Sequence, residues 1–300
     1  MAVQARPMSY DLDLFFEPAI RRSRILEYFA ARKHFKVEND KVVYGHEDTG
    51  VYFFMRLRSG RNILLQITVV AAEFEINYGR PSYFGIEAEK EMAAFVAAFQ
   101  PRIHDPQMRG MGDGPYSRDG FLNGWNFGNV FTVYSALSRD PDWSFTSLPA
   151  DELRADWEWN YHSDERHWRR PSSFVPIIMY FRIEGRLSRV AVWPTGSPIL
   201  LPRVDYVLIG RVISGEKRYG LASWSEVLDV IQRAGIDTAK DPLDIAYFTI
   251  PPTIANWVAN IPLIDVEALE RVRPDQILDE ELIAAARDFK REHVAKSDEA

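Results

Sequence analysis

The sequence predicts an α+β fold in which antiparallel hairpins pack with helices. Polar and apolar residues alternate over residues 9–16, which is the period of a half-buried strand. Over residues 86–99 the apolar residues instead recur at helical spacing, with acidic residues on the opposite side. Short polar connections at residues 58–61 and 184–186 each join two strand-like runs, as the turns of β-hairpins do. Strands joined in this way pair antiparallel.

The first half of the chain contains the first hairpin and several predicted helices. The strands cover residues 9–16, 50–57 and 62–70, and the helices, of which Pro18 opens the first, cover residues 19–32, 86–99 and 121–137. Gly120, Gly124 and Gly128 lie four residues apart on one face of the last of these helices. We therefore expect another element to pack closely against its backbone.

The second half again combines helices with a hairpin, but its side-chain pattern does not repeat that of the first. Its strands cover residues 175–183, 187–193 and 204–213, and its helices cover residues 150–168, 223–234 and 275–294. Between the halves, Asp140, Pro141 and Pro149 interrupt any regular pattern. The predicted units are residues 1–140 and 150–300, either as two similar α+β subdomains or as one continuous domain.

The composition is that of a folded, acidic protein. Of the 300 residues, 46% are hydrophobic and 13% are aromatic, which is enough to build a core. The formal net charge of −7 gives no general attraction to nucleic acid or to an anionic membrane, so neither is expected as a partner. The chain has no cysteine, which excludes disulfides, thiolate metal sites, iron–sulfur clusters and a cysteine nucleophile.

The sequence gives no sign of targeting or of membrane insertion. The first ten residues show no charged segment followed by an apolar stretch, so we expect no secretion signal. The longest apolar runs, such as residues 174–181, are far shorter than the roughly 20 residues of a membrane-spanning helix. We therefore expect a cytoplasmic protein.

The best catalytic candidates are His104 and Asp105. A carboxylate orients an imidazole for proton transfer when the two side chains meet, although neighbours in sequence usually point apart. The glycine-rich loop that follows, residues 109–114, lacks the lysine and hydroxyl residue of a phosphate loop and carries Asp113, which repels phosphate. A hydrolase or small-molecule transferase that uses His104, Asp105 or another carboxylate near this loop is the alternative to a binding protein.

Histidine spacing does not predict a metal site. His162 and His167 lie five residues apart, whereas two ligands on one helix face lie three or four apart. Glu158 and His162 have the right spacing but no apparent third ligand. We expect no metal and no cofactor.

Residues 157–170 interleave aromatic rings with charges and are the best candidate for a partner-binding surface. Tryptophan, tyrosine and arginine are enriched at interface hot spots. The candidate residues are Trp157, Trp159, Tyr161, Arg166, Trp168 and Arg169. The alternative is that the rings face the core and the charges face water. A third hypothesis, single-stranded nucleic acid stacked on these rings and bound by Arg166, Arg169 and Arg170, is disfavoured by the acidity of the chain.

Two polar segments are candidates for a pocket with aromatic walls. Asn77 and Arg80 lie at a predicted turn, and Trp125 and Asn126 lie in the helix over residues 121–137. The segments form a pocket if they converge in space. Otherwise the asparagines cap turns and helix ends, as asparagine commonly does.

Three segments together resemble a group of uncharacterised bacterial proteins that are often encoded beside polymorphic or type VI secretion toxins. The segments are residues 47–53 (EDTGVYF), 76–91 (INYGRPSYFGIEAEKE) and 121–129 (FLNGWNFGN). The resemblance covers mainly the first half of the chain and carries over no catalytic residue. It implies an immunity protein or a secretion-associated accessory factor that acts by occluding a protein partner, such as a cognate toxin.

Overall fold

The α+β prediction is confirmed by the computed structural model, which describes residues 9–61, 66–194 and 197–298. The chain forms two compact units. The first comprises the residues up to Leu153 and from Asp275 onward, and the second comprises Arg154–Pro274. The C-terminal helix therefore belongs to the first unit, whereas the expected halves 1–140 and 150–300 assign it to the second.

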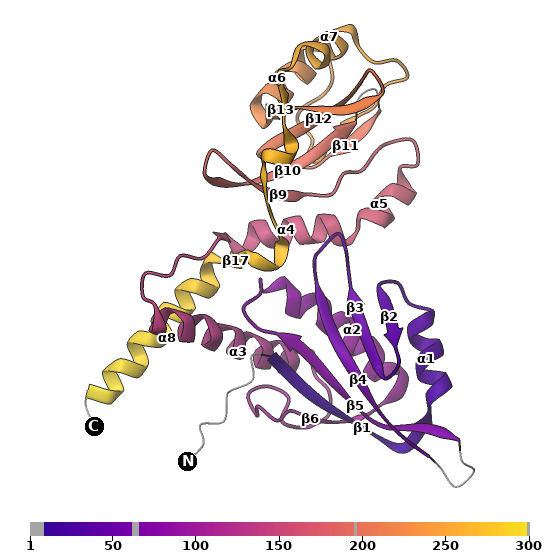
Figure 1. Cartoon of the computed structure of the whole chain (residues 1–300), viewed down its shortest axis with the longest axis vertical. Coiled ribbons are helices and arrows are strands. Elements are labelled where there is room, and N and C mark those ends of the chain that lie inside the picture. The colour runs from indigo at the N-terminus through magenta and orange to yellow at the C-terminus, as the bar shows by residue number, and fades with distance from the viewer. Residues whose placement is uncertain (1–8, 62–65, 195–196, 299–300) are drawn as a thin grey trace. The chain divides into compact units, whose positions relative to one another are not determined.

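The first unit is built on a seven-stranded antiparallel sheet (Figure 1). In spatial order its strands are β2 (Phe35–Glu38), β3 (Lys41–Gly45), β4 (Tyr52–Arg61), β5 (Ile67–Asn77), β1 (Ser9–Arg21), β6 (Arg102–His104) and β7 (Asp113–Gly114). The expected hairpin is present as β4 and β5. Residues 58–61, which were expected to form its turn, instead continue β4 and pair with β5.

The strand β1 runs further than the alternation of residues 9–16 predicts. It continues past Pro18 to Arg21, so the helix α1 (Arg22–Ala30) begins three residues later than expected. The pairing of β1 with β5 shifts its register between Phe15 and Ile20. This irregularity accommodates Pro18, which has no N–H group to donate to a neighbouring strand.

The helices α1, α2 (Tyr83–Phe99) and α3 (Arg118–Arg139) cover one face of this sheet. Phe16 of β1 contacts Phe95 of α2, and Phe74 of β5 contacts Phe121 of α3. Alternate residues of the central strands are buried on this face, as the strand period requires. The core of the first unit therefore lies between the sheet and these three helices.

Close packing against the glycines of α3 is confirmed. A Cβ atom added at Gly128 would lie 2.0 Å from a ring carbon of Tyr78, and one added at Gly124 would lie 2.5 Å from the Tyr10 hydroxyl. The absence of a side chain at both positions allows two tyrosine rings to approach the helix backbone.

The C-terminal helix α8 (Glu280–Asp298) packs on α3. Leu282 and Ile283 of α8 join Val133 and Leu137 of α3 in one apolar cluster. The helix begins five residues after the expected residue 275. The intervening residues form a 3₁₀ turn, Pro274–Gln276, and the short strand β17 (Leu278–Asp279), which pairs with β8 (Ser147–Leu148).

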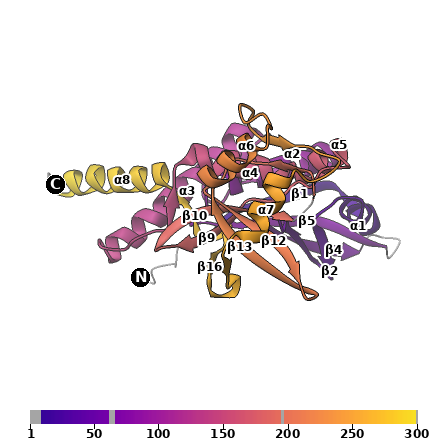
Figure 2. The ribbon, with the colours of Figure 1, turned by 90° about the horizontal axis from the view of Figure 1, so that it is seen from above.

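The second unit contains a six-stranded sheet, shown from another direction in Figure 2. In spatial order its strands are β15 (Leu263–Ile264), β13 (Glu216–Ser223), β12 (Tyr206–Ile213), β10 (Arg186–Pro194), β9 (Met179–Ile183) and β16 (Glu270–Val272). The expected hairpin is present as β9 and β10, and β10 pairs with β12 in parallel. A smaller sheet pairs β11 (Ile199–Leu201) with β14 (Leu243–Ile245).

The helices between residues 150 and 274 differ from expectation in two places. The single helix expected over residues 150–168 is divided at His162 into α4 (Ala150–Tyr161) and α5 (Ser163–Arg169). The helix α7 (Pro252–Asn260) was not expected, whereas α6 (Trp224–Arg233) was, and its Ser223 and Glu226 form a capping box. Across the part of the chain that the structure describes, no helix is both long enough and apolar enough to span a membrane.

Candidate functional site

The face of the first sheet that lies opposite the helices carries charged and aromatic side chains. We call it the open face. Because strand residues alternate between the two faces, Leu12, Phe53 and Phe74 enter the core, and their neighbours along the strands point outward. The outward residues of β1, β3, β4 and β5 include Asp11, Asp13, Lys41, Phe54, Arg56, Glu73 and Glu75.

Strand register places these residues in two rows across the sheet. In one row, Glu75 lies between Phe54 on β4 and Asp11 on β1. In the next row, Glu73 lies between Arg56 and Asp13. Four carboxylates, which we call the acidic block, thus occupy neighbouring positions on two adjacent strands: Asp11, Asp13, Glu73 and Glu75. Like charges directly opposite each other on adjacent strands are destabilising.

Only part of the acidic block is neutralised within the protein. Glu73 forms ion pairs with Arg56, at 3.6 Å, and with Arg58. Asp11 accepts a hydrogen bond from the side-chain amide of Gln107, at 3.2 Å. Among the described residues, neither Glu75 nor Asp13 forms an ion pair. Two of the four carboxylates therefore keep a charge that no ion pair in the described part of the chain neutralises, on a face that also carries Lys41, Arg56 and Arg58.

The environment of Asp11 reflects this arrangement. Burial raises the pKa of the Asp11 carboxyl above its ordinary value, and the neighbouring charges of Glu75 and Asp13 raise the pKa further. Hydrogen bonds from Ser9 and Gln107 act in the opposite direction but do not offset these effects. Placing negative charge at this position is thus energetically unfavourable in the protein alone.

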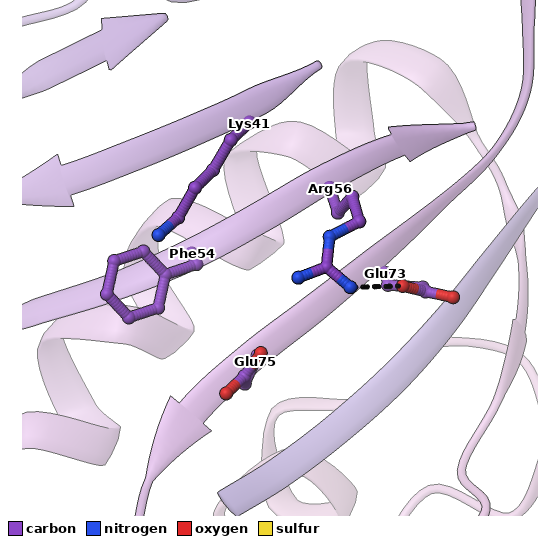
Figure 3. Close-up of a pocket in the computed structure, with 5 residues that line it drawn as sticks. All are labelled: Lys41, Phe54, Arg56, Glu73 and Glu75. Carbon is purple, nitrogen blue, oxygen red and sulfur yellow. Dashed lines mark ion pairs between the residues drawn. The ribbon is translucent and has the colours of Figure 1, made fainter. Parts of the chain in front are cut away.

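A hollow of about 200 Å³ opens on this face, lined by Lys41, Phe54, Arg56, Glu73 and Glu75 (Figure 3). The ammonium group of Lys41 lies 3.9 Å from the centre of the Phe54 ring, which is a cation–π contact. Figure 3 shows Arg56 paired with Glu73 on one side, Phe54 and Lys41 on the other, and Glu75 below them. The hollow can hold a cation between an aromatic ring and a carboxylate.

The structure does not bring His104 and Asp105 together: His104 ends β6 and is half-buried, whereas Asp105 follows the strand and lies in the core. Asp105 is fully buried and accepts hydrogen bonds from the Tyr10 hydroxyl and from the backbone N–H of Met111. It fixes the shape of the loop after β6. His104 instead bonds to Asp113, with Nδ1 at 2.6 Å from the Asp113 carboxylate. The Asp113 carboxylate thus orients the His104 ring.

The residues expected to bind a partner in the second unit are divided between core and surface. Trp157 and Trp159 are buried, and Trp159 donates a hydrogen bond from Nε1 to the Pro176 carbonyl oxygen, at 2.7 Å. Tyr161 is half-buried. Trp168, by contrast, is 81% exposed. The two buried tryptophans are therefore structural, and the outward aromatic residue of the segment is Trp168.

The arginines of this segment bond within the second unit. The Arg166 guanidinium lies over the Trp159 ring, 4.4 Å from its centre, and donates to the Trp159 carbonyl oxygen. Arg169 pairs with Glu165 one turn earlier on α5. Both arginines thus stabilise the local helix structure.

The four residues of the expected polar pocket serve different local roles. Trp125 is fully buried and stacks on Tyr78, whereas Asn126 is exposed on α3. Asn77 is half-buried at the end of β5. The Arg80 guanidinium donates to the Tyr52 hydroxyl at 2.6 Å.

The turn after β5 is held by another asparagine. Asn129 of α3 accepts a hydrogen bond from the Gly79 N–H at 2.7 Å and donates one to the Arg80 carbonyl oxygen. This is the turn-capping role weighed above as the alternative to a pocket.

None of the four residues of the acidic block is among the candidate site residues predicted from the sequence. Its signal was present in part, because the alternation over residues 9–16 already placed Asp11 and Asp13 on one side of a strand. The pairing of that strand with Glu73 and Glu75 is a non-local property that alternation does not reveal.

Comparison with protein-family models, curated proteins and solved structures found no match. Among the described residues, no group of three or more histidine and carboxylate side chains is arranged to hold a metal ion. The geometry of the open face therefore stands as the main guide to function.

Proposed function

We propose that this chain is a binding protein whose open face receives the cationic surface of a protein partner. The observation that carries the proposal is the acidic block, in which Glu75 opposes Asp11 and Glu73 opposes Asp13 in strand register. Glu75 and Asp13 have no ion pair among the described residues. A cation from a partner converts this repulsion into attraction.

The size of the effect follows from the spacing of the strands. Residues directly opposite on adjacent strands lie about 5 Å apart. Two unit charges at that distance repel by about 0.8 kcal/mol in water, which lies within the roughly 0.2–1 kcal/mol that cross-strand charge pairs contribute. Each opposing pair of carboxylates therefore disfavours the free protein by an amount that a bound cation recovers.

Electrostatic complementarity of this kind increases the association rate of a partner and the specificity of its binding. The aromatic ring of Phe54 at the centre of the face adds apolar contact area. The resemblance to proteins encoded beside secretion toxins supports a cognate toxin with a basic surface as the partner. In this proposal the protein acts in the cytoplasm of the producing cell and neutralises the toxin by occlusion.

The experiment is a comparison of three tagged proteins in affinity purification from the native cells, with mass spectrometry of the co-purified proteins. The first is the wild type, and the second carries Asp11→Asn and Asp13→Asn. The third is a charge-matched control with Glu184→Gln and Glu267→Gln, at two exposed residues of the second unit. We expect a stoichiometric basic protein with the wild type and the control, and its loss with the open-face variant.

Two results contradict the proposal. One is equal recovery of the partner by the open-face variant, which places the interface elsewhere. The other is the absence of any stoichiometric protein partner with the wild type.

The pair of His104 and Asp113 supports a second candidate, the hydrolase or small-molecule transferase considered from the sequence. The 2.6 Å contact between Nδ1 and the carboxylate orients the imidazole, as in proton-transfer sites. His104→Ala tests this candidate. Unchanged biological activity of a folded His104→Ala protein removes it.

A further inference from the structure

The Phe54 ring on the open face already holds a cation. The Lys41 ammonium group lies 3.9 Å from the ring centre, and among the described residues it forms no ion pair. Lys41 is itself exposed on β3 and reaches the ring from the neighbouring strand. The ring face is thus accessible to a positively charged group from solvent.

The carboxylate beside the ring lacks a counter-charge. Glu75 lies directly opposite Phe54 in the strand register, and Figure 3 shows both at the hollow. The other carboxylate of the hollow, Glu73, is already paired with two arginines. A further cation entering the hollow, which Lys41 and Arg56 already line, therefore meets one aromatic face and one carboxylate without an ion pair among the described residues.

A guanidinium group matches this pair of features better than an ammonium group. It is planar, so it stacks on an aromatic ring while its N–H groups bind a carboxylate in a bidentate manner. The hollow, at about 200 Å³, is smaller than the roughly 300–1,000 Å³ of pockets for small-molecule ligands. Its size suits a single side chain.

We infer that the hollow is the seat of one arginine side chain of the partner, bound between Phe54 and Glu75, and that Lys41 competes for this seat in the free protein. The inference rests on the proposed function, since it names the group of the basic partner that the open face recognises. It assigns different roles to the carboxylates: Glu75 binds the arginine, while Asp11 and Asp13 attract the partner from outside the hollow.

The test uses capped tri-arginine and tri-lysine peptides as probes, titrated into the full chain while the Phe54 ring resonances are followed by NMR. We expect tri-arginine to shift these resonances and to bind more tightly than tri-lysine. Glu75→Gln should weaken the affinity for tri-arginine by about two- to tenfold. Lys41→Gln should increase the affinity for tri-arginine by about two- to fivefold, because the competing cation–π contact is lost.

Phe54→Leu is the variant that separates stacking from charge alone. It keeps an apolar side chain at the position and should abolish the preference for tri-arginine over tri-lysine. Glu267→Gln, at an exposed residue of the second unit, removes the same charge as Glu75→Gln and should leave both affinities unchanged. Equal affinity of the two peptides for the wild type, or no shift of the Phe54 resonances at millimolar peptide, overturns the inference.

Failure of the inference can be told from failure of the proposed function. If the native partner is lost with Asp11→Asn and Asp13→Asn but binds Glu75→Gln and Phe54→Leu as tightly as the wild type, the arginine seat is refuted and the proposed function stands. If tri-arginine binds as expected and no protein partner is recovered, the seat is supported and the proposed function fails.

Discussion

Two neighbouring glutamates on β5 should respond to the same substitution with opposite changes in stability. Glu75→Gln removes a charge that is opposed by Asp11 and has no ion pair among the described residues. We expect it to stabilise the first unit by about 0.5–1 kcal/mol, the upper part of the range for cross-strand pairs. Glu73→Gln relieves a similar repulsion from Asp13 but loses two ion pairs, with Arg56 and Arg58. We expect a net destabilisation of about 0.5 kcal/mol, because exposed ion pairs contribute about 0.2–1 kcal/mol each.

Hydrogen exchange of the β1 and β5 backbone amides is the suitable assay. It reports the opening free energy of this sheet separately from that of the second unit. Addition of about 1 M salt should shrink both differences, because it reduces the Debye length to about 3 Å. The reasoning is refuted if Glu75→Gln lowers protection as much as Glu73→Gln does, since that result removes the repulsion from which the account starts.

Three further predictions concern pH and packing. The folded pKa of Asp11 is raised above its ordinary 3.8, so the folded protein retains a proton that the unfolded chain has released. The contribution of Asp11 to stability should therefore become more favourable as the pH falls through the raised pKa and level off below about 3.8. Asp11→Asn should be more stable than the wild type at neutral pH, and the difference should vanish at acid pH in denaturant titrations. Gly128→Ala should lower the melting temperature, with a cost of about 1–3 kcal/mol, because its Cβ meets the Tyr78 ring at 2.0 Å; an increase, as expected from helix propensity alone, contradicts this packing. Trp159→Ala should lower the free energy of unfolding of the second unit, measured with urea, by about 3–5 kcal/mol. Trp168→Ala should change the same quantity by less than about 0.5 kcal/mol, and similar losses at both sites contradict the assigned burial.

Local periodicity accounts for the parts of the fold that the sequence predicted well. The alternation over residues 9–16 identified β1 and its two outward aspartates, and the four-residue spacing of glycines in α3 identified a close-packing face. These features depend on residues near each other in the chain. Their geometry is set by the period of one strand or one helix.

The remaining features depend on contacts between distant residues. The strand β13 was not expected, and its Gly220 packs so closely on Ile261 that an added Cβ would lie 2.5 Å from that side chain. Neither a propensity nor a period reveals such a contact. The acidic block likewise requires the register between β1 and β5, which pairs Asp11 with Glu75 and Asp13 with Glu73, residues far apart in the sequence.

The candidate site residues predicted from the sequence do not lie together in the structure, for a related reason. His104 ends β6 and Asp105 follows the strand, and their side chains bond to different residues: His104 contacts Asp113, and Asp105 accepts a hydrogen bond from Tyr10. The tryptophans of residues 157–170 could not be sorted into core and surface from composition. That distinction required the structure around α4 and α5.

The central claim is that the open face binds a basic protein partner, and the most direct measurement is the salt dependence of that affinity. The dissociation constant of the partner should be measured from low salt to about 0.5 M salt for the wild type and for the variant with Asp11→Asn and Asp13→Asn. The account predicts that the wild type binds more tightly at low salt, that its affinity falls steeply as salt is added, and that the two proteins converge at high salt. The same affinity and the same salt slope for both proteins would contradict it.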